Sequence, residues 1–387
     1  MKPHRNGNGR HRADPPHRPG PLDRFRPVLI TGGAGFIGVN VAARWAEQGQ
    51  PVLIFDNLSR PGVRRNLEWL TGRYGRRIRF KPADVRDERA VRQAVSCACR
   101  VYHFAAQVAV TTSLADPAAD FEVNARGTLN VLEAARRLAD PPPLLFTSTN
   151  KVYGNLKQME LVEEERRYTP ADRVTRLCGA GEDQPLDFHS PYGCSKGAAD
   201  QYVLDYARCY GLPAVVFRMS CIYGPHQCGN EDQGWVAHFL LSALREEPIS
   251  IYGDGKQVRD VLFVDDLVEA MVAALDQIDA TRGRAFNIGG GPQNTLSLLE
   301  LLDLIDDLVG RRPETHFAPW RKGDQRYYVS DIRSMKAATG WRPRVSPEAG
   351  VETLCRWLEE SSPVAPAAVA ALSSDDFAGD LQLPRMT

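Results

Sequence analysis

The sequence lacks the features that mark a membrane protein, a secreted protein or a nucleic-acid-binding protein. Its C-terminal apolar run, Val364 to Leu372, is much shorter than the ~20 residues that cross a bilayer. Residues 1–27 contain no continuous apolar stretch, which argues against a secretory signal. The 48 basic residues balance 48 acidic ones, so no overall field favours nucleic acid. We therefore expect a cytoplasmic protein that binds neither a membrane nor nucleic acid.

The cysteines also lack the spacing of a metal site. Eight are scattered through the chain, only Cys97 and Cys99 lie close together, and no pair of CxxC motifs is present. Reduced thiols and no bound metal are therefore expected.

The two ends of the chain differ from its middle in composition. Residues 1–27 carry seven Lys or Arg against Asp14 and Asp23, with several Gly and Pro and little apolar content. The far end is rich in Ala, Pro, Ser and Asp. Such segments cannot bury enough apolar surface to fold, so we expect a disordered basic arm at 1–26 and a disordered tail at 361–387.

Short apolar runs alternate with helical patterns from residue 27 onward. The runs read as strands near 28–30, 51–56, 78–80, 101–104, 144–147 and 214–217. Helical spacing separates them near 36–48, 64–74, 87–96, 118–139 and 190–210. This alternation predicts an α/β fold, a Rossmann-type doubly wound parallel sheet.

The alternation weakens beyond Arg218. Helical patterns near 234–246, 265–277, 296–309 and 347–359 mix with short strands at 249–252, 261–264 and 286–288. We expect a smaller C-terminal α/β lobe packed over the carboxyl edge of the sheet. Residues 27–219 would then form the dinucleotide-binding domain, and residues 220–360 mainly the substrate-binding lobe.

A glycine-rich loop, TGGAGFIG at 31–38, follows the first strand and opens a helix. Gly32 would allow the tight turn, Gly35 the approach of a pyrophosphate, and Gly38 close packing of helix on strand. The phosphates would lie at the helix N-terminus, where free N–H groups point. Asp56 ends the next strand, 18 residues after Gly38. This context favours a dinucleotide site over an ordinary βα turn.

Asp56 also indicates which dinucleotide is bound. Its carboxylate can bind both ribose hydroxyls and would repel a 2′-phosphate, and neither Asn57 nor Leu58 supplies a cation to receive one. Arg60 is the nearest basic residue. NAD rather than NADP is therefore predicted. Asp84, after the third strand, is placed either to approach the adenine or to act as a plain helix N-cap.

A tyrosine and a lysine lie one helical turn apart, at Tyr192 and Lys196. A Tyr of pKa ~10 is a poor base at neutral pH. A Lys at i+4 on the same helix face can lower that pKa. Thr149 follows a central strand and would bind the substrate oxygen while Tyr192 takes its proton. Each side chain has a structural explanation by itself, but together they predict general acid–base catalysis with hydride transfer by the cofactor.

These motifs resemble one known family. The segments TGGAGFIG at 31–38, STNKVYG at 148–154 and Tyr192-x-x-x-Lys196 are similar to those of the extended short-chain dehydrogenase/reductase family of nucleotide-sugar epimerases and dehydratases. The resemblance covers about residues 27–360. Longer segments resemble the members that invert C2 of a CDP-linked hexose; these segments are 107–113, 148–154, 187–202, 232–235 and 255–260.

The resemblance implies a tightly held NAD, a transient 2-keto sugar and return of the same hydride to the other face. The expected catalytic residues are Thr149, Tyr192 and Lys196. The expected cofactor contacts are Gly32, Gly35, Phe36, Ile37, Gly38, Asp56, Asn57, Asp84, Val85, Ala105, Tyr192 and Lys196. The expected substrate contacts are Gln107, Thr149, Gln233, Arg259 and Arg326. The two arginines would clamp the pyrophosphate, for which a guanidinium fork is suited, unless they form surface salt bridges.

Three other functions stay open. A 4-epimerase acting on a UDP-sugar would use identical catalytic groups. A dehydratase generally has an acid pair after the catalytic Thr, where this chain has Asn150 and Lys151. A non-catalytic NAD-binding protein could dispense with the Tyr and the Lys. The segments 155–184 and 219–228 depart from the pattern of the CDP-hexose enzymes, so the sugar is not determined by the sequence.

A homo-oligomer, a dimer or a dimer of dimers, is also predicted. The helical pattern at 190–210 presents Tyr202, Leu204, Tyr206 and Tyr210, more apolar surface than a solvated helix carries. The family commonly pairs through this helix and the one near 118–139. The alternative is that these side chains all pack inside one subunit.

Overall fold

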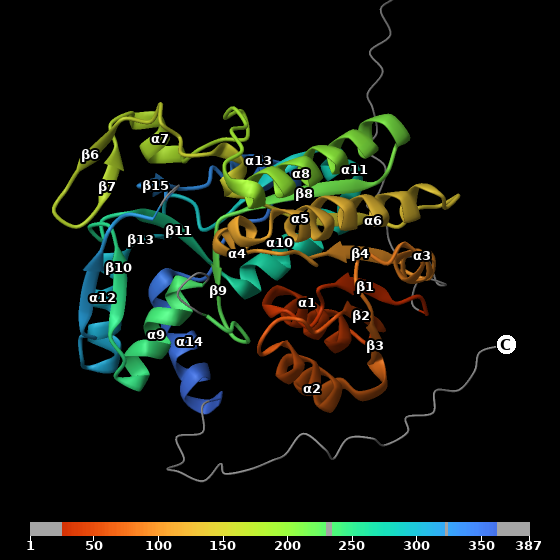
Figure 1. The fold of residues 1–387 in the computed structure, drawn as a ribbon, viewed down its shortest axis with the longest axis horizontal. Helices are drawn as coiled ribbons and strands as arrows, with labels where there is room; N and C mark the ends of the chain where they lie inside the picture. Colours follow the sequence, from red (N-terminus) through yellow and green to blue (C-terminus); the bar gives the residue numbers. More distant parts are fainter. Residues whose placement is uncertain (1–24, 230–233, 322–323, 362–387) are drawn as a thin grey trace, which may run out of the picture.

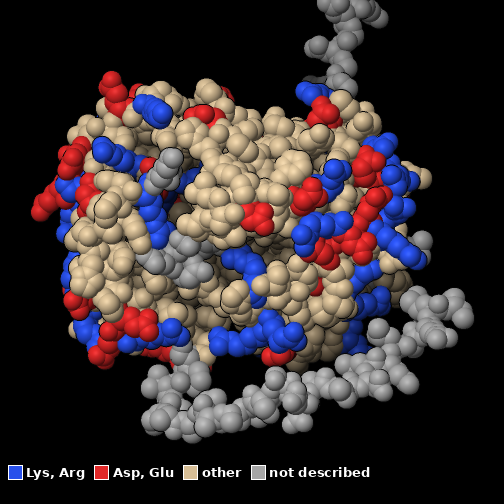
Figure 2. All heavy atoms as spheres, in the orientation of Figure 1, with Lys and Arg blue, Asp and Glu red and all other residues tan. Residues whose placement is uncertain are grey.

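The computed structural model describes residues 25–229, 234–321 and 324–361. Nearly all of the predicted basic arm and C-terminal tail therefore lies outside the described residues. Within the described part of the chain, no helix is long and apolar enough to cross a membrane. On the face shown in Figure 2, basic and acidic side chains are interspersed along the rim, as the balanced composition implies.

The larger part of the molecule is built on a seven-stranded sheet whose strands are all parallel. The spatial order is β12-β8-β5-β4-β1-β2-β3. The strands are β1 (Val28–Thr31), β2 (Val52–Asp56), β3 (Ile78–Pro82), β4 (Arg100–His103), β5 (Leu144–Thr149), β8 (Ala214–Met219) and β12 (Ala285–Ile288). The order reverses between β1 and β4, which confirms the doubly wound sheet and places a ligand crevice at their carboxyl ends.

Helices cover both faces of this sheet (Figure 1). Along β5, Leu145 faces one cluster of apolar side chains, whereas Leu144 and Phe146 face the other. Burial on both faces explains why the strands read as continuous apolar runs. The first cluster includes α1 (Phe36–Glu47), α2 (Val63–Tyr74), α10 (Val264–Asp276), α11 (Ile278–Thr281) and α13 (Arg333–Thr339). The second includes α3 (Glu88–Ser96), α6 (Gly127–Arg136) and α8 (Ser190–Tyr210).

The helix that carries Tyr192 and Lys196 and the helix region packed against it differ in regularity. Helix α8 spans the predicted range, with Pro in its first turn, and ends at Gly211 in the left-handed region (φ 68°). The helix predicted at 118–139 is instead divided into α5 (Pro117–Phe121), a π-helical turn η2 (Glu122–Arg126) and α6. Such turns are frequent at functional sites, and this one lies against the start of α8.

The rest of the chain forms a smaller mixed α/β lobe, on the left in Figure 1. Strand β11 is central and pairs with β9, β13 and β15. Strand β12 follows residue 219 in the sequence, yet it pairs with β8 at the edge of the large sheet. The chain therefore returns once from the small lobe to the large sheet. The lobe's strands are β9 (Cys221–Tyr223), β10 (Ile249–Tyr252), β11 (Val258–Phe263), β13 (Thr295–Ser297), β14 (Thr315–Ala318) and β15 (Tyr327–Tyr328). Its main helices are α9 (Trp235–Arg245), α12 (Leu298–Val309) and α14 (Pro347–Ser361).

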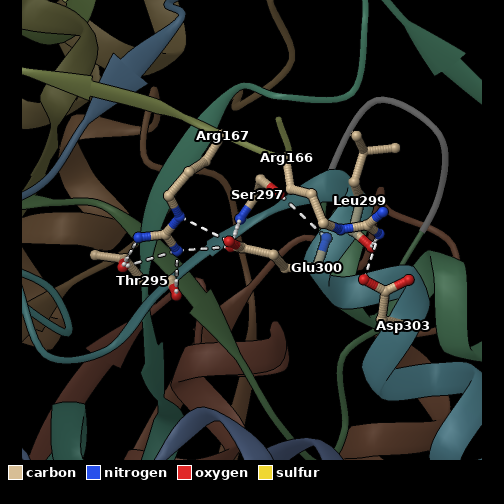
Figure 3. Close-up of polar contacts among 7 residues, drawn as sticks. All are labelled: Arg166, Arg167, Thr295, Ser297, Leu299, Glu300 and Asp303. Atoms are coloured by element: carbon tan, nitrogen blue, oxygen red, sulfur yellow. Dashed lines mark hydrogen bonds and ion pairs between the residues drawn. The ribbon is translucent and has the colours of Figure 1, made fainter. Parts of the chain in front are cut away.

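The segment after β5 forms a hairpin that is fixed to the small lobe. It comprises β6 (Leu161–Glu163) and β7 (Tyr168–Pro170). Arg167 in its turn donates to both carboxylate oxygens of Glu300 (2.7 and 2.6 Å), and Arg166 pairs with Asp303 (Figure 3). Glu300 also completes the capping box that begins α12. The hairpin is therefore anchored by charged contacts rather than by apolar packing alone.

The remaining short elements connect these parts. They are η1 (Gly75–Arg77), α4 (Val110–Ala115), η3 (Asn150–Tyr153) and α7 (Arg173–Cys178).

Candidate active site

The glycine loop lies at the carboxyl end of β1, beside the point where the strand order reverses. Gly32 has φ 67°, and a Cβ there would lie 2.7 Å from the backbone nitrogen of Ala105. A Cβ on Gly38 would lie 2.5 Å from the Gly32 carbonyl oxygen. Both positions need glycine, the first for its turn and the second for contact between α1 and the loop. A Cβ on Gly35 would meet only the Gly32 carbonyl, at 3.2 Å, so this position faces open space.

The first turn of α1 is suited to an anion. Its N-cap residue is Gly35, which has no side chain that could accept a hydrogen bond from the first backbone N–H groups of the helix. Phe36 and Ile37 begin the helix beside it. These features fit the pyrophosphate of a dinucleotide.

Asp56 ends β2 next to this loop, as predicted. Its two oxygens accept hydrogen bonds from the backbone nitrogens of Ala34 (3.1 Å) and Leu58 (2.8 Å). Burial raises the pKa of its carboxyl group, and the two hydrogen bonds oppose that shift. The carboxylate is thereby fixed at the strand end, in a position that fits a ribose.

Asp84 and Asn57 form a cluster with Arg86 at the end of β3. Asn57 donates to Asp84 (2.9 Å), and Arg86 binds both oxygens of Asp84. The hydrogen bonds from Arg86 lower the pKa of Asp84 to about 2. The N-cap of α3 is Asp87, so the alternative that Asp84 is a plain N-cap is wrong.

Val85 and Ala105 belong to the same apolar cluster, Val85 after β3 and Ala105 after β4. Val85 is buried, and its carbonyl accepts a hydrogen bond from Asn130 (2.9 Å). Ala105 follows β4, and its backbone nitrogen donates to the Thr31 hydroxyl (3.3 Å). That hydroxyl also contacts buried His103 (2.6 Å), whose pKa burial lowers to about 3, so the ring is neutral.

The structure brings the two predicted oxygen-bearing catalytic residues together. Thr149 ends β5, where its hydroxyl accepts a hydrogen bond from the Lys151 backbone nitrogen (3.2 Å), and this hydroxyl is close enough to the phenol of Tyr192 in the first turn of α8 to affect its pKa. Burial raises the pKa of Tyr192 to about 12; the Thr149 hydroxyl and the charge of Arg60 lower it, and the charge of Asp120 raises it. The sequence analysis considered Arg60 only as the nearest basic residue for NADP, but its charge also lowers the pKa of Tyr192.

Lys196 lies one turn further along α8 and is also buried. Its ammonium group donates to the Thr147 carbonyl and lies 4.2 Å from the centre of the Phe146 ring. Burial lowers its pKa to about 7, and the charges of Asp200 and Asp120 raise it. The sequence argument expected Lys196 to lower the pKa of Tyr192, but burial raises that pKa and Lys196 is not among the groups that shift it. Lys196 itself depends on the neighbouring carboxylates Asp200 and Asp120 to stay charged.

Gln107 is used within the protein. Its side-chain nitrogen donates to the Ala109 carbonyl (2.8 Å) and to Asp120 (3.0 Å), and its side-chain oxygen accepts from the Ala109 nitrogen (2.5 Å). These contacts form the turn that leads into α4. Contact of Gln107 with a substrate stays a prediction.

The predicted phosphate-binding arginines lie in the small lobe. Arg259 on β11 is buried and pairs with Asp324 (2.8 Å). Arg326 is exposed and lies between the rings of Tyr168 and Trp320, 5.3 and 5.5 Å from their centres. Gln233 lies outside the described residues.

A pocket of about 280 Å³ opens beside Arg326. Its walls come from the hairpin segment, through residues such as Asn155, Lys157 and Leu161, and from the segment around Asp324 and Arg326. It therefore has polar and charged groups on both sides, which suits a polar ligand rather than an apolar one.

Several residues at the site were not found from the sequence. Lys151 lies beside Arg259 and Asp324, and burial lowers its pKa to about 8. Buried Arg218 binds both oxygens of buried Asp200 (2.9 Å each), one turn of α8 beyond Lys196. Lys151 stands in the STNKVYG segment, but nothing in that segment indicates its neighbours; the proximity of these residues arises from contacts between separate strands and helices.

Comparison with known proteins assigns the family. A profile of the NAD dependent epimerase/dehydratase family matches residues 28–289. Over 341 residues the chain is 45% identical to the CDP-paratose 2-epimerase of Salmonella typhi, covering 85% of this chain and 98% of that protein. It is 33% identical to the UDP-glucose 4-epimerase of Mycolicibacterium smegmatis, covering 87% and 99%.

A solved structure gives the same assignment. The Thermus thermophilus UDP-glucose 4-epimerase in complex with NAD matches with a TM-score of 0.72 and 33% identity, over 87% of this chain and 100% of that one. The expected sheet, the glycine loop and the paired Thr149 and Tyr192 are all present here. The chain belongs to the NAD dependent epimerase/dehydratase family.

Proposed function

We propose that this protein is an NAD-dependent epimerase that inverts C2 of a CDP-linked hexose of the paratose and tyvelose type. The proximity of Thr149, at the carboxyl end of β5, to Tyr192, in the first turn of α8, carries the assignment to catalysis. The 45% identity to a CDP-paratose 2-epimerase over nearly the whole of that protein supports the substrate.

NAD would be held by residues whose geometry fits it. The loop of Gly32, Gly35 and Gly38 and the start of α1 at Phe36 and Ile37 suit the pyrophosphate. Asp56 suits the adenosine ribose. We expect the adenine to contact Asn57, Asp84 and Val85. We expect the nicotinamide end to contact Ala105, Tyr192 and Lys196. When bound, the cofactor supplies reversible hydride transfer at a carbinol carbon.

The chain's own residues would supply the proton chemistry. Thr149 orients the substrate hydroxyl, and Tyr192 takes its proton during oxidation and returns it during reduction. Lys196 would stabilise the phenolate charge and orient the nicotinamide ribose. After oxidation to the 2-keto sugar, the sugar turns over in the crevice, and its other face is presented for reduction.

The nucleotide would bind at the small lobe. Arg259 and Arg326 suit the pyrophosphate, and the pocket beside Arg326 has room for a polar group. Gln107 and Gln233 complete the set of proposed substrate contacts. The anchored hairpin provides one wall of this pocket.

A dehydratase activity is less compatible with the residues after Thr149. Elimination of water needs a further acid and base, but the next two residues are an amide and an amine. Asn150 contacts Gln325 (3.4 Å), and Lys151 lies beside Arg259. A UDP-sugar 4-epimerase would use the same groups and is the second candidate, supported by the 33% identity to such an enzyme.

Incubation of the protein with CDP- and UDP-hexoses, followed by NMR of the products, tests the substrate. We expect inversion at C2 of a CDP-hexose; inversion only at C4 of a UDP-sugar would identify the second candidate. Tyr192→Phe should abolish turnover while leaving NAD bound, whereas a non-catalytic NAD-binding protein would have no turnover to lose.

Isotope retention tests the mechanism. Because the hydride moves between carbon and cofactor, the product formed in D₂O should carry no deuterium at C2. A substrate deuterated at C2 should keep its label. A deprotonation mechanism would instead bring solvent deuterium to the inverted carbon, and that result would overturn the proposal.

A homodimer or a dimer of dimers is also proposed, paired through α8 and the neighbouring α5–α6 region. Tyr202 and Tyr210 are about half exposed on α8, and Phe121 is half exposed at the end of α5. Tyr206, by contrast, is buried and hydrogen-bonded to Glu133, so it packs inside the subunit. Light scattering at micromolar concentration should give a mass of at least two chains.

A further inference from the structure

A buried carboxylate lies behind the catalytic pair, in a network that the proposed mechanism does not use. Asp120 on α5 has no exposed surface. Its oxygens accept hydrogen bonds from Gln107 (3.0 Å), Asn124 (3.2 Å) and the Ser195 hydroxyl (2.5 Å). Ser195 stands directly before Lys196 in α8.

The network joins three separate segments. Asn124 lies in the π-helical turn and also donates to Ser195 (3.0 Å) and to the Gln107 carbonyl (3.0 Å). The turn thereby brings Asp120 and Asn124 against the same hydroxyl. A π-turn costs helix stability, so its use here to complete a polar network indicates a role beyond packing.

Burial raises the pKa of Asp120, while the hydrogen bonds from Ser195 and Gln107 and the charge of Lys196 oppose that rise. Because the three donors are uncharged, they favour the ionised carboxylate without cancelling its charge. That charge acts on Lys196 and on Tyr192. Tyr192 and Lys196 thus share one buried anion, contributed by a different helix.

The other ionisable groups around Lys196 differ from Asp120. Asp200, on α8 itself, also acts on Lys196, but both of its oxygens are held by Arg218, which offsets its charge. His103, on β4, is neutral because burial lowers its pKa to about 3. On β5 the contacts of Lys196 are the Thr147 carbonyl and the Phe146 ring, neither of which titrates.

We propose that Asp120 is a positioning residue for the proposed epimerase reaction: its charge keeps Lys196 in the ammonium form, and its hydrogen bond to Ser195 fixes the first turns of α8. This inference rests on the proposed function for its catalytic consequence. Its electrostatic part can be measured on Lys196 without a substrate.

The sign of the effect follows from charge. Removing a negative charge makes it easier for both neighbours to lose a proton, so the pKa of Lys196 and the pKa of Tyr192 should both fall. An opposite charge within ~4–6 Å typically shifts a pKa by ~1–3 units, and we expect about one unit. The pH profile of kcat/KM should therefore move as a whole to lower pH.

Asp120→Asn is the variant of choice because the amide fits the same space. Its oxygen can accept from Gln107 and Asn124, and its nitrogen can donate to Ser195. The Ser195 hydroxyl, no longer donating to residue 120, can then donate to the Tyr192 carbonyl oxygen, which lies 3.2 Å away. Asp120→Ser, which removes the charge and leaves room for water, is the second variant. Asp116→Asn is the matched control, since Asp116 is the exposed N-cap of the same helix.

The readout is an NMR titration of the lysine ε-carbons in the full-length protein with NAD bound, after labelling with ¹³C-lysine. The chain has eight lysines, and Lys196→Arg assigns the relevant signal. We expect the Lys196 midpoint to fall by about one pH unit in Asp120→Asn or Asp120→Ser, and to stay unchanged in Asp116→Asn.

The outcomes separate the two proposals. An unchanged Lys196 midpoint in the folded Asp120 variants overturns the role of Asp120. A lowered midpoint in a protein that epimerises no nucleotide sugar supports the electrostatic role and refutes the proposed function. A loss of kcat with unshifted pH profile and unshifted Lys196 midpoint would show that Asp120 is merely structural.

Discussion

Alanine substitutions at Gly35 and Gly38 should separate cofactor binding from folding. Both glycines lie in the same loop, but a methyl group would meet different surroundings at each. At Gly38 it would lie 2.5 Å from the Gly32 carbonyl oxygen and 2.6 Å from the Gly33 Cα, both rigid backbone atoms. At Gly35 it would meet one atom at 3.2 Å, with φ −71°, which alanine adopts easily.

The magnitudes follow from these contacts. Overpacking typically costs ~1–3 kcal/mol, so Gly38→Ala should lower the free energy of unfolding by about that amount. A loss of 1 kcal/mol lowers Tm by ~2–4 °C in domains of 150–250 residues, and this chain of 387 residues should show a decrease of about 2 °C or less. Gly35→Ala should cost less than ~1 kcal/mol, the difference between glycine and alanine at an N-cap. Its methyl group would instead occupy the space in which the pyrophosphate approaches the loop.

The assay is thermal unfolding of both variants with and without NAD, together with the Kd for NAD by calorimetry. A ligand that binds the folded state raises Tm by mass action, so a variant that folds but binds weakly loses the NAD-dependent increase. We expect Gly35→Ala to show this behaviour and Gly38→Ala to lose stability even without NAD. A Gly35→Ala variant that binds NAD like the parent would refute the assignment of the pyrophosphate to this loop.

Two further substitutions test the surroundings of the site. Asp200→Asn leaves the Arg218 guanidinium buried without its partner, so it should lower the free energy of unfolding, measured in urea, by ~3–5 kcal/mol. The control Asp205→Asn removes an exposed ion pair from the same helix and should hardly change the midpoint of urea unfolding. A small effect of Asp200→Asn would contradict the importance of this ion pair. Arg167→Ala removes the bidentate contact of the hairpin with Glu300 and should raise KM for the nucleotide sugar while kcat stays close to its original value. Equal KM values in the variant and the parent would show that the hairpin is not a wall of the substrate site.

The sequence by itself determined the features that depend on neighbouring residues. The spacing of Tyr192 and Lys196 puts both on one face of α8, because a helix repeats every 3.6 residues. The glycine loop, with Gly38 against the loop backbone, follows from local sterics in the same way. The alternation of buried strands with amphipathic helices predicted the parallel sheet and hence the crevice at its carboxyl ends.

Only the tertiary structure decided the environment of those residues. Asp120 and Ser195 are 75 residues apart in the chain, and Arg60 is still further from Tyr192, so no local pattern indicates their contact. Likewise, the helical spacing of Tyr206 fitted either an exposed or a buried face, and packing against Glu133 determined which. Burial and charge interactions depend on which segments surround a group in three dimensions. The pKa of Lys196 and Tyr192 therefore belongs to the folded protein, although the positions of both residues are determined by the helix alone.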